Sequence, residues 1–138
     1  MSSASSRKKA VKKTAKKPKS KPRKTVANDE TCLQMHCAKW LRDAHPGLLA
    51  FHVANEREAP VQYHVKLKRL GVMAGVADFL VFPVGARKIA IELKDDKGTQ
   101  EPDQIAFEKR WVRSGGEYYL VRTLEDFQSI VNAAAIFG

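Results

Sequence analysis

Three charged residues, Asp78, Glu92 and Lys94, lie at the ends of two apolar runs within the stretch from Gly71 to Lys94. Asp78 precedes one apolar run, and Glu92 and Lys94 close the next. Carboxylate oxygens are the ligands that hard divalent cations prefer, and a cation bound by them can activate water. Two carboxylates with an ammonium beside them therefore predict a site for Mg²⁺ or Mn²⁺. The alternative is a solvated ion pair at the ends of strands, which contributes little to stability.

A hairpin of two short strands would bring these residues together. The apolar runs predict strands over residues 77–82 and 88–94, joined by a tight turn. The start of the first strand then lies beside the end of the second, so Asp78 lies next to Glu92. Because side chains alternate along a strand, Glu92 and Lys94 share one face. The opposite face carries Ile89, Ile91 and Leu93.

The pattern of Asp, connection and Glu-x-Lys resembles the PD-(D/E)xK nuclease signature. Here it consists of Asp78 and the run from Glu92 to Lys94. Its surroundings resemble one branch, the VRR-NUC (virus-type replication-repair nuclease) domain, in its small stand-alone phage and bacterial form. Ala77 departs from this pattern, because the family usually has Pro before the Asp. Over residues 29–125 the resemblance rests on Asn55-Glu56, a Lys-rich helix from Lys66 to Gly71, a Gly-x-x-Asp turn from Gly75, and a later Gln104.

The resemblance implies both a fold and an activity. The expected fold is α/β and restriction-endonuclease-like, with a mixed central sheet flanked by helices. The expected activity is Mg²⁺- or Mn²⁺-dependent endonucleolytic cleavage of DNA in repair, by a homodimer on branched substrates such as flaps or four-way (Holliday) junctions. Two alternatives stay open: a non-catalytic DNA-binding protein that keeps a nuclease-like fold, and cleavage of RNA, since phosphate contacts do not distinguish the two.

The same resemblance implies roles for individual residues. Catalytic roles fall to Asp78, Glu92, Lys94 and Gln104. The metal ligands are Asp78, Glu92, the backbone carbonyl of Leu93 and, from the first helix, Glu30. Asn55 and Glu56 would lie near the active face. Simpler roles remain open for three of these residues. Glu30 would stabilise the dipole of its helix, and Glu56 would belong to a turn. Gln104 would be a hydrogen-bonded core residue.

Positive charge is concentrated in residues 1–28. The chain has 138 residues and a formal net charge of +10, and this segment holds eleven of its 25 Lys and Arg and no acid. It has almost no large apolar residue, so we expect a disordered tail. A nuclease-like body favours nucleic-acid anchoring over a localisation signal or a solubilising role. The anchoring lysines would be Lys8, Lys9, Lys12, Lys13, Lys16 and Lys17.

The length of the remaining segment, residues 29–138, predicts a single domain. Periodicity and turn signals predict helices over residues 29–44 and 60–70, from just after residue 99 to about 113, and from 124 onward. They predict further strands over residues 48–54 and 117–122. The third helix has Thr99 as its candidate N-cap, and the fourth has Thr123. The second helix would bury Tyr63, Leu67 and Leu70. Lys66, Lys68 and Arg69 at its end would contact DNA phosphate or form a solvated basic face.

Cysteine use and hydropathy bear on the cellular compartment. Cys32 and Cys37 lie within one predicted helix, which favours free thiols over a disulfide. No apolar run approaches the ~18 residues of a membrane span, and the N-terminal segment lacks the apolar core of a signal peptide. We therefore expect an intracellular protein without a membrane partner, in the cytoplasm or nucleoid if its source is a phage or a bacterium. His52 is expected to be a core or edge histidine rather than a ligand.

Overall fold

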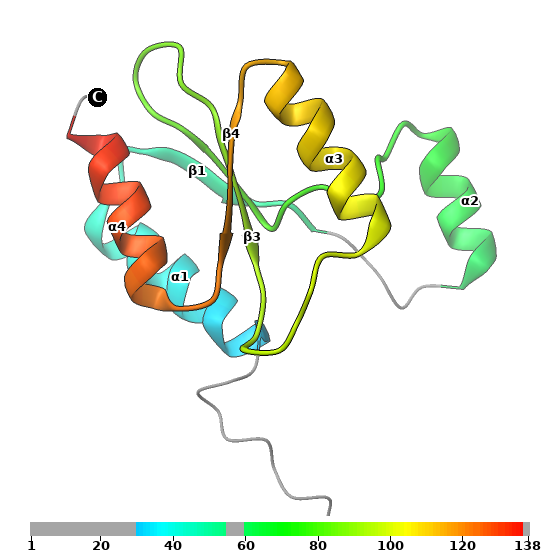
Figure 1. The fold of residues 1–138 in the computed structure, drawn as a ribbon, viewed down its shortest axis with the longest axis horizontal. Coiled ribbons are helices and arrows are strands. Elements are labelled where there is room, and N and C mark those ends of the chain that lie inside the picture. The colour runs from blue at the N-terminus through cyan, green and yellow to red at the C-terminus, as the bar shows by residue number, and fades with distance from the viewer. Residues whose placement is uncertain (1–29, 55–59, 137–138) are drawn as a thin grey trace, which may run out of the picture.

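The computed structural model describes residues 30–54 and 60–136. In this part of the chain one mixed sheet lies between helices, so the predicted α/β architecture is confirmed (Figure 1). In chain order the elements are α1 (Glu30–Ala44), β1 (Leu49–His52), α2 (Val61–Arg69), β2 (Phe79–Phe82), β3 (Ile89–Leu93), α3 (Pro102–Arg113), β4 (Glu117–Val121) and α4 (Leu124–Ala135). The predicted basic tail lies outside the described residues.

The strands lie in the order β1-β2-β3-β4. The β1–β2 and β2–β3 pairs are antiparallel, whereas β3 and β4 are parallel and are connected through α3. In the β2–β3 hairpin Phe79 pairs with Ile91. Continuing that register by one residue places Asp78 opposite Glu92, as the sequence predicts.

Helices cover the sheet on both faces, and the core is correspondingly divided in two. α1 and α4 pack on one face, where alternate residues of β3 join them in one cluster. Its buried members are Cys37, Leu41, Phe79, Val81, Ile89, Ile91, Leu93, Val121, Phe127, Val131 and Ala134. α3 covers the other face with Phe107, which packs with Ala77 and Ala90. Each large apolar side chain buried in this way contributes about 1.5–3 kcal/mol.

The two helix starts that were predicted from capping residues have different outcomes. Thr123 caps α4, accepting a hydrogen bond from the backbone N of Asp126, as predicted. The prediction of Thr99 for α3 is wrong, because the N-cap is Glu101. Pro102 supplies a preset φ at the first helical position, and the side chain of Gln104 accepts a hydrogen bond from the Glu101 backbone N. These two devices start the helix later than a hydroxyl cap at Thr99 would.

The predicted inner face of α2 is also wrong. No residue of α2 is buried. Tyr63 is exposed, as is Leu70 directly after the helix, and Leu67 is partly buried. In Figure 1 the helix stands beyond α3 and apart from the sheet. Without a neighbouring layer, its apolar residues have nothing in the described part of the chain against which to be buried.

Among the helices of the described residues, none combines the length and the apolar character that a membrane span requires.

Candidate metal centre

Three carboxylates meet where β2 begins, β3 ends and α1 begins. Glu30, Asp78 and Glu92 each contribute an oxygen atom, and these oxygens lie within 4.8 Å of one another. Asp78 is 6% exposed and Glu92 is 0% exposed, while Glu30 is partly buried. Like charges so close together are costly in a poorly solvated site. A donor set made only of carboxylate oxygens fits a hard divalent cation and does not fit a site for a soft metal.

Asp78 is fixed through both its backbone and its side chain. Its carbonyl oxygen accepts a hydrogen bond from the Val53 backbone N at 2.9 Å and lies 2.7 Å from Nδ1 of His52. Because a carbonyl only accepts, Nδ1 must carry the proton. The carboxylate atom Oδ2 accepts a hydrogen bond from the Leu93 backbone N at 2.7 Å. His52 therefore supports the site from an edge strand, which agrees with its predicted role.

Glu92 is held from α3 by an amide side chain. Nε2 of Gln104 donates to Oε1 of Glu92 at 2.7 Å, and Oε1 of Gln104 accepts from the Glu101 backbone N at 2.8 Å. Gln104 is only 2% exposed. Both ends of this amide thus bond within the protein, and they connect the start of α3 to the central strand.

The ammonium of Lys94 lies beside the carboxylates. Its Nζ is 3.9 Å from Oε1 of Glu92, and the residue is 4% exposed. Gly98 packs against it, since a Cβ built there would lie 3.3 Å from Cδ of Lys94. Desolvation of an ammonium is costly unless opposite charge is near, and the carboxylates supply that charge. The predicted common face of Glu92 and Lys94 is confirmed.

Arg122 supports the loop beside Lys94, and sequence reasoning did not identify it. Its Nη1 donates to the backbone oxygens of Asp95 and Gly98, the latter at 2.8 Å. Both bonds go to backbone carbonyls of a segment more than twenty residues away in sequence. An Arg at the end of a strand carries no signal for such a contact, so no pattern in the sequence would have found it.

The uncharged side chain of Tyr118 lies close enough to Glu92 and Asp78 to interact with them electrostatically. Burial raises the pKa of its phenol to about 12; the hydrogen bond from Gln100 lowers it in part, and the negative charge of Glu92 contributes to the increase. Nε2 of Gln100 donates to the Tyr118 hydroxyl at 3.2 Å. The phenol is therefore protonated at neutral pH and adds no further negative charge to the site.

The remaining predicted residues are not brought to the carboxylates by the described part of the structure. Asn55 and Glu56 lie outside the described residues, as do the six lysines of the tail. Lys66, Lys68 and Arg69 are exposed at the end of α2.

Cys32 and Cys37 are free thiols, as predicted, and burial raises the pKa of Cys37 to about 12. Such a thiol is unreactive at neutral pH.

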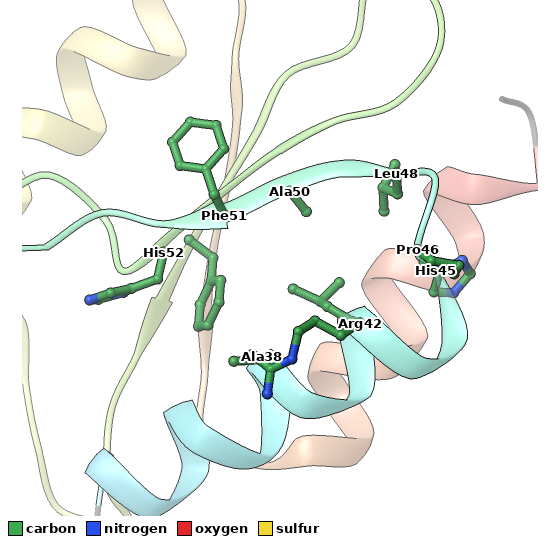
Figure 2. A pocket seen from close by; sticks show the side chains of 10 residues that line it. Ala38, Arg42, His45, Pro46, Leu48, Ala50, Phe51 and His52 are labelled. Carbon is green, nitrogen blue, oxygen red and sulfur yellow. The ribbon is translucent and has the colours of Figure 1, made fainter.

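A pocket of about 330 Å³ lies between α1 and β1. In Figure 2 the labelled lining side chains come from both elements, with His52 on the strand and Arg42 on the helix. Its lining residues are Ala38, Leu41, Arg42, His45, Pro46, Leu48, Ala50, Phe51, His52 and Phe79. Glu30, Asp78 and Glu92 are not among these lining residues, so the pocket is distinct from the carboxylate cluster.

Solved structures of other proteins share this arrangement of helices and strands. One, described as a VRR_NUC domain protein, has a TM-score of 0.59 and 20% identity, covering 83% of this chain and 93% of that chain. Another, described as a VRR_NUC domain, has a TM-score of 0.50 and 16% identity over 75% and 94% of the two chains. No protein-family model matches the sequence, and no curated protein matches it. At these identities the likeness shows the fold.

Proposed function

We propose that this chain, which has the fold of VRR-NUC domains, is a divalent-metal-dependent endonuclease that hydrolyses DNA phosphodiester bonds. The observation that supports this most directly is the trio of Glu30, Asp78 and Glu92, whose oxygens lie within 4.8 Å of one another. A fold gains no stability from three carboxylates placed so close together with so little exposure, because their mutual repulsion and desolvation oppose folding. A bound cation offsets both costs.

Mg²⁺ or Mn²⁺ would be held by the three carboxylates and by the backbone carbonyl of Leu93. When bound, such a cation polarises a phosphate group and activates water near neutral pH. The carboxylates come from three separate elements, so the site depends on the packing of α1 against the β2–β3 hairpin. Glu92 is further oriented by Gln104 through the 2.7 Å hydrogen bond.

Lys94 would stabilise the negative charge that develops on the phosphate as the bond to its leaving oxygen breaks. Its ammonium is held 3.9 Å from Glu92 in a site where it is only 4% exposed. A preorganised charge acts more strongly in such a poorly solvated site than in water, and it needs no reorganisation during the reaction.

Contacts with the DNA backbone would come from basic residues outside the site. Residues 60–77 contain Lys66, Lys68 and Arg69 and no acid, and the N-terminal segment adds eleven Lys and Arg. Lys and Arg at phosphates supply affinity that is independent of sequence. Branched DNA as the substrate, and a homodimer with two active sites, are proposed from the resemblance to small stand-alone VRR-NUC nucleases alone.

The test is to incubate the purified chain with labelled linear, flapped and four-way DNA, with Mg²⁺ or Mn²⁺ and with EDTA. We expect products from branched DNA only when the metal is present. Cleavage that persists in EDTA contradicts metal dependence. A gel shift without products under every condition identifies a non-catalytic DNA-binding protein instead.

The matched variants are Asp78→Asn and Asp96→Asn. An Asn at position 78 would direct its carbonyl oxygen to the Leu93 N–H and its amide NH₂ toward the cation, so we expect cleavage to fall by about 10²-fold or more. Asp96 is exposed in the loop after β3, and the same change there should leave cleavage unaltered. Equal rates for the two variants contradict the proposal.

A further inference from the structure

The first turn of α3 contacts the segments that carry both buried carboxylates. On one side Nε2 of Gln104 donates to Oε1 of Glu92. On the other side Gly75 lies directly against the helix backbone. A Cβ built at Gly75 would lie 2.3 Å from the carbonyl carbon and oxygen of Asp103 and 2.7 Å from the Gln104 backbone N. Real Cβ atoms do not approach backbone atoms this closely.

Two features of the structure require glycine at position 75. Its φ is +77°, in the left-handed region that side chains disfavour, and its missing Cβ permits the contact with α3. Asp78 follows only three residues later, so the place where the chain touches α3 limits where Asp78 can lie. The hydrogen bond from the Leu93 backbone N to Oδ2 then fixes the direction of its carboxylate.

Hydrogen bonds at its start and packing further along the helix hold the first turn of α3 in place. The Glu101 backbone N donates to Oε1 of Gln104, which holds the amide side chain at both ends. One turn further along the helix, the rings of Phe107 and Trp111 stack on each other, and Phe107 packs in the core over β3. Movement of the first turn would therefore disturb the packing of the helix as a whole.

We propose that the first turn of α3 sets the spacing between the two buried carboxylates, with Gln104 positioning Glu92 and the contact at Gly75 positioning Asp78. The inference rests on the proposed function in so far as this spacing serves a cation. Gln104 is then a positioning residue, because both of its amide atoms bond within the protein and it is 2% exposed. It would act on the cation through Glu92 rather than touch phosphate or water.

The first test compares Gly75→Ala with Gly71→Ala. Both glycines have positive φ, +77° and +94°, but a Cβ at Gly71 has no atom within 4 Å. Both variants carry the backbone cost of a side chain at positive φ, but only Gly75→Ala also pushes the turn away from α3. In the metal-free protein, the NMR signal of the Leu93 amide reports its bond to Asp78. We expect that signal to shift, and the affinity for Mn²⁺ to fall about tenfold or more, in Gly75→Ala alone.

The second test uses Gln104→Met, which keeps the length of the side chain but removes its amide, including the bond that Oε1 accepts from the Glu101 backbone N. It removes the bond to Glu92, so we expect the affinity for Mn²⁺ measured by calorimetry to fall about 10–100-fold. At subsaturating Mn²⁺ the rate of DNA cleavage should fall together with the occupancy of the site by Mn²⁺. A loss of rate without a loss of Mn²⁺ affinity would instead mark a residue in contact with the reacting groups, and would overturn the positioning role.

These measurements separate the inference from the proposed function. If the unsubstituted chain does not cut DNA, the proposed function fails, but the Leu93 signal and the Mn²⁺ affinities still decide the inference. An unshifted Leu93 amide in Gly75→Ala, or an unchanged Mn²⁺ affinity in Gln104→Met, overturns it. If Gly75→Ala does not fold, Gln104→Met decides the outcome by itself.

Discussion

Glu30 is the carboxylate whose role the sequence left most open. It stands in the first turn of α1, where an acid stabilises the helix dipole by about 0.3–1 kcal/mol without any ligand. The structure adds that one of its oxygens lies with those of Asp78 and Glu92 within 4.8 Å. These two roles make different predictions for a neutral replacement.

We expect Glu30→Gln to weaken Mn²⁺ binding about tenfold or more, because a charged ligand becomes a neutral one. The control is Glu125→Gln, which also removes an acid from the first turn of a helix, α4, but outside the carboxylate cluster. Glu125→Gln should lower the melting temperature slightly through the lost dipole interaction, whereas in metal-free Glu30→Gln the relief of repulsion among the three carboxylates offsets that loss. Calorimetric titration with Mn²⁺ distinguishes them, and equal affinities for the two variants would reduce Glu30 to a helix-dipole role.

The residues of the site differ in how far the sequence could identify them. Asp78, Glu92 and Lys94 could be placed together because strand alternation and a short hairpin are local rules. The contact of Gly75 with α3 depends on segments more than 25 residues apart meeting at one point. No local pattern encodes that meeting, so the reason for a glycine there became visible only in three dimensions.

At the scale of elements, helices that pack on the sheet could be predicted better than strand ends or the isolated helix. The sequence of α4 predicts one apolar face made of Leu124, Phe127, Ile130, Val131 and Ala134. Phe127, Val131 and Ala134 are buried, and Leu124 and Ile130 are partly buried. The strand predicted over residues 48–54 is shorter in the structure, Leu49–His52, because β1 pairs with β2 over those residues only. The stripe on α2 misled because periodicity states which residues share a face, and not whether another layer covers that face.

An ion pair connects the beginnings of the parallel strands β3 and β4. The guanidinium of Arg87 donates two hydrogen bonds to the carboxylate of Glu117, at 2.8 and 2.9 Å, and this contact lowers the pKa of Glu117. A carboxyl whose pKa is lower in the folded state stabilises the protein above its unfolded pKa, and that stabilisation is lost as the pH falls through the folded value.

We therefore expect Glu117→Gln to lower the melting temperature at pH 7 and to leave it nearly unchanged at pH 2. The effect should be small and should diminish in high salt, because the pair is partly exposed. Thermal unfolding followed by circular dichroism at the two pH values checks this. A loss of the same size at both would mean that packing of the side chain, and not its charge, stabilises the strand ends.

At the scale of the whole molecule, charge is divided unevenly along the chain. Residues 1–28 hold eleven Lys and Arg and no acid, within a chain whose formal net charge is +10. The remaining 110 residues are therefore close to neutral, with one more acid than bases. Long-range attraction to a polyanion would come chiefly from the N-terminal segment.

Deleting residues 1–28 should flatten the salt dependence of DNA binding. Each phosphate contact that is lost reduces the slope of log affinity against log salt by about 0.9. Binding titrations between low and moderate salt measure this slope, and mapping of the products on branched DNA shows whether the position of the cut is preserved. An unchanged slope would contradict anchoring by this segment, and a displaced cut would show that it takes part in recognition.

The trio of acids also has a consequence for the order in which the protein matures. Asp78 and Glu92 belong to a local hairpin, but Glu30 is carried by α1, which packs in one cluster with the last helix, α4. During synthesis the apolar cluster that holds α1 against the sheet is complete only after α4 has left the ribosome. A growing polypeptide would thus have two of its three acids in register and would gain the third only once its final helix docks.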